Sequence, residues 1–199
     1  MDWIDAWMPS WQFAEVHHIR SSASPAALLD AAAAYRPDDD GLIGAALALR
    51  EAPGRLAAAL GLASTLDSRR RFGKADFLPL GRLGDEALAY GLVGRFWEPG
   101  YGLVPLPDAD AFRTFAKPGV AKLLLAFEAY ADDSGSGSSS DSDSEEAGAA
   151  TVITTVSRLV CADDATRRRM ALYWGLIRPA SGLVRQRLLA QIKRVAEGR

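Results

Sequence analysis

The stretch that decides the fold is "DDATRRRMALYWGLIRPASGLVRQRLLAQIKRVAEG", residues 163–198, the longest helical pattern in the chain. Asp163 or Asp164 is suited to cap its start, because a carboxylate accepts hydrogen bonds from the free N–H groups there. Pro179 should kink the helix or split it in two, since proline lacks an amide donor and clashes with the preceding turn. The arginines are expected on the opposite, solvent-facing side. The apolar residues that recur at helical spacing predict one buried face: Met170, Tyr173, Trp174, Ile177, Val184, Leu188, Ile192 and Val195.

Strand patterns come directly before this helix. Residues 121–132 and 150–163 are rich in β-branched and aromatic residues, which favour strands. Residues 75–97 alternate with a two-residue period around Gly84 and Asp85, a pattern typical of a hairpin. The insert at residues 132–149 is rich in Ser, Asp and Gly and has no apolar residue larger than alanine, so it is predicted to form a disordered hairpin loop.

The first half of the chain predicts one more strand and several short helices. Residues 11–22 alternate in the manner of a strand. Ser24, followed by proline and an alanine-rich run, predicts a capped helix over residues 25–35. Residues 42–61 predict one or two further short helices, and Asp108 is suited to cap a helical turn. The order of strand, short helices, antiparallel strands and terminal helix predicts an α+β protein with helices on one face of the sheet.

The composition fits one soluble domain. The chain has 199 residues, of which 49% are hydrophobic and 24% charged, as in ordinary globular proteins. A single cysteine, Cys161, excludes an internal disulfide and lies in a strand pattern. Neither a basic secretion signal nor the apolar run of about 18 residues that a membrane span needs is present. We therefore predict a cytoplasmic protein with a leader at residues 1–10 and a single domain over residues 11–199.

The leader carries a small aromatic patch. Trp3, Trp7 and Trp11 recur at a four-residue spacing, but Pro9 interrupts any helix that would align them. We expect the leader to be a flexible segment docked on the domain. A weak contact of these tryptophans with a membrane surface is the alternative. Met8 is an alternative start of the protein, because a strand pattern follows it directly.

Few side chains carry obvious chemistry. His17 and His18 are adjacent in a strand pattern, so they point to opposite faces and cannot jointly hold a metal. No zinc, phosphate-loop, dinucleotide or nucleophile-elbow motif occurs, so neither a metal nor a cofactor is predicted. Arg95 and Arg158 also lie in strand patterns, and either could bind a ligand carboxylate with two hydrogen bonds if it pointed inward. Outward exposure is the expected state of both.

Four segments together resemble a known superfamily: "VHHIRSSASPAALLDAA" (16–32), "YGLVGRFWEPGYGLV" (90–104), "KPGVAKLLLAFEAY" (117–130) and "RRRMALYWGLIRPASGLVRQRLLAQIKR" (167–194). They resemble an uncharacterised bacterial group within the START-like, or SRPBCC, superfamily, over residues 10–197 without the serine-rich insert. The resemblance implies the helix-grip fold, in which a strongly bent antiparallel sheet wraps around a long C-terminal helix and leaves a cavity between them. Members of this superfamily include lipid carriers, plant hormone receptors and polyketide cyclases.

A bent sheet would explain the glycines in "YGLVGRFW", residues 90–97. Gly91 and Gly94 would let the sheet curl, because glycine permits a sharp bend or the close approach of a neighbour. Phe96 would then fill space, whereas Trp97 alternates with it and should face the other side. Residues 90–107 are expected to form two short strands around a turn.

The resemblance and the residue pattern together predict a protein that binds a small hydrophobic or amphipathic molecule between the sheet and the terminal helix. The predicted polar contacts are His17, His18, Arg95 and Arg158. The predicted wall residues are Tyr90, Leu92, Phe96, Phe127, Trp174 and Ile177.

Two alternatives stay open. One is a cyclase or dehydratase that uses the same pocket with an inward His17 or His18 and Arg95. The other is a module in which the leader and the basic C-terminal face contact a membrane or a protein. The lack of a catalytic signature favours binding over catalysis, and the net charge of −2 argues against a nucleic-acid partner.

Overall fold

The structure is a computed structural model that describes residues 3–36, 73–98, 100–132 and 150–198. The helices predicted over residues 42–61 and nearly all of the serine-rich insert lie outside the described residues. The described elements, in chain order, are η1 (Trp3–Ala6), β1 (Phe13–Ser21), α1 (Pro25–Ala34), η3 (Lys74–Asp76), β2 (Leu78–Leu83), β3 (Ala87–Gly94), α3 (Ala109–Thr114), β4 (Ala121–Ala131), β5 (Thr151–Cys161) and α4 (Asp164–Ala196).

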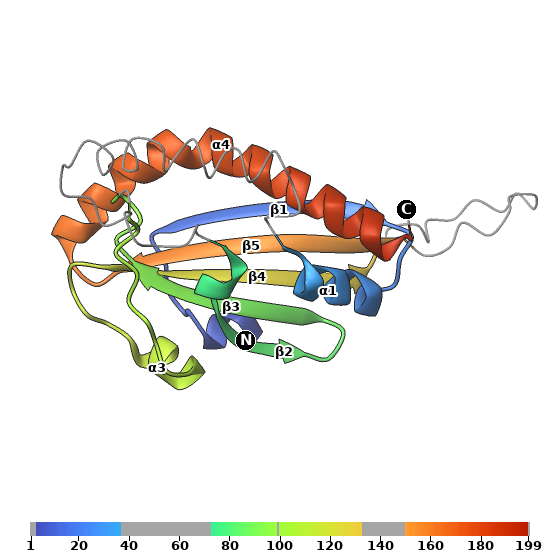
Figure 1. Ribbon diagram of the computed structural model, residues 1–199, viewed down its shortest axis with the longest axis horizontal. Helices are drawn as coiled ribbons and strands as arrows, with labels where there is room; N and C mark the ends of the chain where they lie inside the picture. The colour runs from blue at the N-terminus through green and yellow to red at the C-terminus, as the bar shows by residue number, and fades with distance from the viewer. Residues whose placement is uncertain (1–2, 37–72, 99, 133–149, 199) are drawn as a thin grey trace, which may run out of the picture.

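The five strands form one antiparallel sheet in the order β1-β5-β4-β3-β2. The α+β class and the antiparallel sheet predicted from the sequence are thereby confirmed. The strands lie side by side and bow along their length (Figure 1). In β2 the pairing with β3 shifts between Pro79 and Gly81, a bulge of the kind that bends a strand. The first strand, β1, forms one edge of the sheet and pairs with the last strand, β5.

Helices α1 and α4 cover the same face of this sheet. Ser24 caps α1 as predicted, because its hydroxyl accepts a hydrogen bond of 3.3 Å from the Ala27 N–H. Asp163 caps α4 by accepting a hydrogen bond of 2.8 Å from the Thr166 N–H. The long α4 runs lengthwise along the sheet near β1 and β5, with α1 beside its carboxyl end (Figure 1). We call this side of the sheet the helix face.

The opposite face, here called the packed face, is covered by η1, the residues that follow it, and α3. Ile4 and Met8 of the leader are each 1% exposed, and Phe112 of α3 is fully buried. They pack against strand residues such as Leu124 and Val156. The leader is thus docked on the domain.

An arginine and two aromatic contacts fasten the leader. Arg158 projects from β5 onto the packed face, where its guanidinium lies 2.6 Å from the Asp5 carboxylate. The same guanidinium stacks 3.8 Å above the centroid of the Trp11 ring. Trp3 and Trp7 meet edge to face and are half-buried, while Trp11 is 42% exposed.

The glycines of β3 permit close approach. A Cβ at Gly91 would lie 2.5 Å from the Phe112 ring, and one at Gly94 would lie 2.6 Å from the Tyr101 carbonyl oxygen. No side chain fits at either distance, so glycine is required for these neighbours to pack on β3. Both residues pair in register with β4, and the one shift of register recorded in this part of the sheet is the bulge in β2.

Two predictions about residues 90–107 were wrong, and of the two outcomes predicted for Pro179, a kink or a split, the split does not occur. Residues 103–106 form no strand, so residues 90–107 contain only β3 and a turn. The chain leaves the sheet after Gly94, strand alternation stops there, and Trp97 packs against the same cluster as Phe96 instead of facing away from it. Pro179 does not split α4, which continues through it as one arched helix (Figure 1).

The predicted face of α4 also needs two corrections. Met170, Leu188 and Ile192 are buried as predicted, but Val195 is 63% exposed, because the neighbouring Ala196 is the residue of this turn that packs against the core. Arg185 does not lie on the solvent side with the other arginines. Its side chain is 15% exposed and turns toward the sheet. None of the described helices combines the length and the apolar character that crossing a membrane requires.

Candidate functional site

A cavity of about 310 Å³ lies between the helix face of the sheet and α4. Two packed clusters lie between α4 and the sheet, one at each end of the cavity. At one end Met170 packs on Phe96 and Leu159, and at the other end Leu188 packs with residues of α1 and with Phe127. Members of both clusters line the cavity. The middle of α4 therefore spans a gap that neither cluster fills.

The strands contribute the apolar floor of the cavity because side chains alternate along them. In β4 the residues Leu123, Leu125 and Phe127 point into the cavity, whereas Leu124 and Ala126 between them are fully buried on the packed face. This two-residue alternation is what a sheet with one packed and one open face requires.

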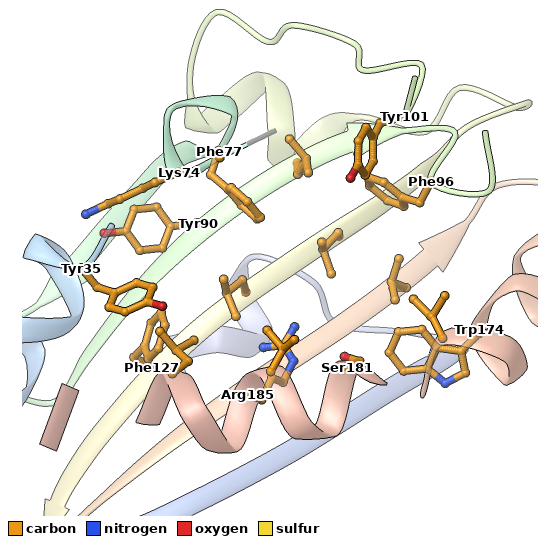
Figure 2. Close-up of a pocket in the computed structure, with 18 of the residues that line it drawn as sticks. Tyr35, Lys74, Phe77, Tyr90, Phe96, Tyr101, Phe127, Trp174, Ser181 and Arg185 are labelled. Atoms are coloured by element: carbon orange, nitrogen blue, oxygen red, sulfur yellow. The ribbon is translucent and has the colours of Figure 1, made fainter. Parts of the chain in front are cut away.

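All six predicted wall residues line this cavity. Tyr90, Leu92, Phe96 and Phe127 come from the sheet side, and Trp174 and Ile177 come from α4. Figure 2 shows the labelled members of this set around one space, with Trp174 and Phe127 near the helix and Tyr90 and Phe96 across from them. That they bind a ligand stays a prediction.

None of the four predicted polar contacts lines the cavity. Arg95 is exposed and pairs with Glu98 at 3.1 Å, because it lies in the turn after β3. Arg158 holds the leader on the packed face. His18 is exposed, and His17 lies on the helix face with its Nε2 atom 3.0 Å from Glu15. The structure therefore does not bring a histidine and Arg95 together on the cavity wall, as the cyclase alternative requires.

The charged residue at the centre of the site is Arg185, which the sequence prediction missed. It lines the cavity from α4 and donates a hydrogen bond of 3.1 Å from Nη1 to the Thr155 hydroxyl on β5. Its Nε atom is buried and lies 3.9 Å from an oxygen of Glu15. Burial lowers the pKa of Arg185 from its ordinary value, and the nearby Glu15 carboxylate opposes that effect.

Glu15 is shared among several groups. Its Oε2 atom accepts a hydrogen bond of 2.9 Å from the Ser181 hydroxyl, and its Oε1 atom lies 3.0 Å from His17. The residue is only 8% exposed, so this carboxylate is a buried charge that three neighbours stabilise. β1 lies close to α4 here, since a Cβ on Gly182 would be in ordinary van der Waals contact with Glu15 and His17, at 3.6 Å.

The spacing along α4 could have revealed Arg185. Arg185 lies four residues after Ser181 and three before Leu188, both of which line the cavity, so an arginine at 185 falls inside the apolar stripe.

The remaining polar groups of the wall are aromatic hydroxyls and one lysine. Burial raises the pKa of Tyr90, so its hydroxyl stays protonated and can donate a hydrogen bond. Lys74 of η3 lies 5.8 Å from the centroid of the Tyr90 ring, at the edge of the site in Figure 2. Its pKa is lowered by burial and by Arg36.

The one cysteine is no nucleophile for this cavity. Cys161 is buried at the end of β5, and burial, with a smaller contribution from Asp163, raises the pKa of its thiol to about 11. A thiol with that pKa is almost wholly protonated at neutral pH. Within the described ranges, no three His, Cys, Asp or Glu residues are grouped in a way that could hold a metal ion.

Comparisons of the chain with protein-family models, with curated proteins and with solved structures gave no significant match to any of them.

Proposed function

We propose that this protein binds a small apolar or amphipathic molecule in the cavity between the sheet and α4. The observation that carries the proposal is the cavity itself, about 310 Å³ in volume and walled by aromatic and aliphatic side chains with a few polar groups. Sites for small organic ligands combine these features, with volumes of about 300–1,000 Å³. The volume is at the lower end of that range, which favours a ligand with one chain or one ring system over a two-chain lipid.

We further propose that the architecture is the helix-grip of the START-like superfamily. An antiparallel sheet, a long C-terminal helix along one face and a cavity between them support this assignment. The walls supply shape and exclude water, and no covalent step is needed for the proposed role.

The experiment is a fluorescence titration with the neutral dye N-phenyl-1-naphthylamine, which brightens in apolar surroundings. We expect saturable binding of one dye per chain. The variant Leu125→Trp, which places a large ring in the cavity from β4, should abolish this binding while the circular dichroism spectrum stays that of the wild type. A matched control is Tyr130→Trp, an exposed position on the same strand, which should leave dye binding unchanged.

Two results would count against the proposal. One is a dye signal that never saturates, which marks adsorption to the surface. The other is a saturable signal that Leu125→Trp leaves intact, which places the dye elsewhere on the molecule.

A further inference from the structure

We propose that Arg185 is the anchor for an anionic group on the ligand, so that the cavity selects a carboxylate, or a similar anion, attached to a small apolar body. This inference rests on the proposed binding function and specifies the class of ligand. It replaces the sequence prediction that Arg95 or Arg158 would make such a contact.

The first observation is that most N–H donors of the Arg185 guanidinium make no hydrogen bond to the described residues. A guanidinium carries five N–H donors and stays charged in proteins. Within the described part of the chain, the hydrogen bond to Thr155 is the only one that Arg185 donates, and the buried Nε atom donates none. A buried charge with unused donors is costly unless a further acceptor reaches it.

The second observation is that Glu15 does not fill this role. The distance of 3.9 Å from Nε to Oε2 exceeds the 2.7–3.2 Å typical of an N–H to oxygen hydrogen bond. The Ser181 hydroxyl already donates a hydrogen bond to Oε2 of Glu15, and His17 Nε2 lies 3.0 Å from Oε1. Glu15 therefore orients the guanidinium and lowers the cost of its burial, but it leaves N–H donors of Arg185 available for a ligand.

The third observation is the sign of the charge on the wall. Arg185 and Lys74 are the charged residues among the described residues that line the cavity, and both are basic. Figure 2 shows Arg185 near the middle of the site, between Phe127 and Ser181, whereas the Lys74 ammonium is directed outward at the far edge. Arg185 is thus the group placed to bind an anion in the cavity with two hydrogen bonds.

The apolar remainder of the wall fixes the rest of the ligand. Ile177 and Trp174 continue along α4 from Arg185, and Leu123 faces them from β4. A ligand whose anion meets Arg185 can therefore extend its apolar body along the cavity between helix and sheet. Long apolar ions with one charged end match this arrangement.

The test compares three probes that share an alkyl chain and differ in their head group: decanoate, 1-decanol and decylammonium. Each displaces N-phenyl-1-naphthylamine at neutral pH, below the concentration at which it forms micelles. We expect decanoate to bind the wild type at least about tenfold more tightly than decanol, the effect of one charge-assisted hydrogen bond. Decylammonium should bind most weakly.

Variants then assign the preference to one side chain. Arg185→Met keeps an unbranched side chain of similar apolar stem and removes the charged guanidinium, so it should remove the tenfold preference and leave decanol binding intact. Arg185→Lys should retain part of the preference, because an ammonium keeps the charge and loses the fork. The matched control is Arg95→Gln, which removes an exposed arginine outside the cavity and should change nothing.

The single variant leaves the Glu15 charge without its partner and can fail to fold for that reason. The double variant Glu15→Gln with Arg185→Met removes both charges and serves in its place. The wild-type comparison of the three probes needs no variant at all.

The outcomes separate the two proposals. Equal affinities for decanoate and decanol, with the dye still displaced, would overturn the anion site and leave the cavity function standing. A preference for decanoate that survives in Arg185→Met but is lost in Lys74→Gln would also overturn it. Failure of the dye and of every probe to bind would reject the cavity function itself.

Discussion

The two faces of the sheet are built from the same strands and yet are packed differently. On the packed face, Phe112 and Leu124 are fully buried. Because Gly91 has no side chain, the Phe112 ring can lie directly against β3. On the helix face, α4 rests on the two clusters at its ends and on β1 and β5 through Ser181 and Arg185, and a cavity remains between it and β3 and β4. Short elements such as η1 and α3 can pack closely along the bowed surface of the sheet. One long helix contacts such a surface over only part of its length.

The largest expected contrast between the two faces comes from truncating one side chain on each. Phe112→Ala removes a fully buried ring and should lower the free energy of unfolding by about 3–5 kcal/mol. Ile177→Ala removes a half-buried side chain that already borders a void, so it should cost only about 1 kcal/mol. Urea denaturation of the two variants measures the difference. Equal costs would mean that the helix face is packed as tightly as the other.

A smaller contrast comes from adding volume at neighbouring positions of β4. Leu124→Phe forces extra atoms into the packed face and should destabilise the protein by about 1–3 kcal/mol. Leu125→Phe, one residue further on, points the same ring into the cavity and should cost less than about 1 kcal/mol.

The same pair separates stability from binding. Leu125→Phe should weaken the binding of N-phenyl-1-naphthylamine because it takes up cavity volume, whereas Leu124→Phe should leave dye affinity unchanged in the molecules that remain folded. Comparable destabilisation by both variants would show that the cavity closes in solution.

The sequence predicted the packed elements better than the open site. Ser24, Asp108 and Asp163 cap helices as expected, because capping depends on a few neighbouring residues. The alternation in β4 likewise follows from strand geometry alone. These are local effects, and a pattern in the sequence is enough to predict them.

The predictions failed for side chains whose orientation depends on contacts with segments that are distant in the sequence. Trp97 was assigned to the wrong side because strand alternation was extended past Gly94, where the chain turns to meet Tyr101. Arg158 was a candidate ligand contact, but the leader comes back to β5 and pairs Asp5 with it. Arg185 was placed outside because arginines usually face solvent, and only the position of β1 reveals why Glu15 draws it inward.

The smallest expected effect concerns the cap that positions the amino end of α4. The Asp163 carboxylate accepts hydrogen bonds from the Thr166 hydroxyl at 2.6 Å, the Gly119 N–H at 2.8 Å and the Thr166 N–H at 2.8 Å. These bonds, led by that of the Thr166 hydroxyl, lower the pKa of Asp163 from 3.8 to about 2. Gly119 lies just before β4, so the cap ties the start of the helix to the sheet beside the cavity.

The sign of the pH dependence follows from this lowered pKa. Asp163 stabilises the fold fully above its ordinary pKa, and the contribution is lost as the pH falls from about 4 toward about 2. Asp163→Ala should therefore be less stable than the wild type at neutral pH, and the gap should close across that acid window. Thermal unfolding at several pH values measures it, with Asp164→Ala as the neighbouring control, since Asp164 receives none of the three bonds. A gap that stayed constant down to about pH 2 would show that the cap stabilises α4 through its shape and not through its charge.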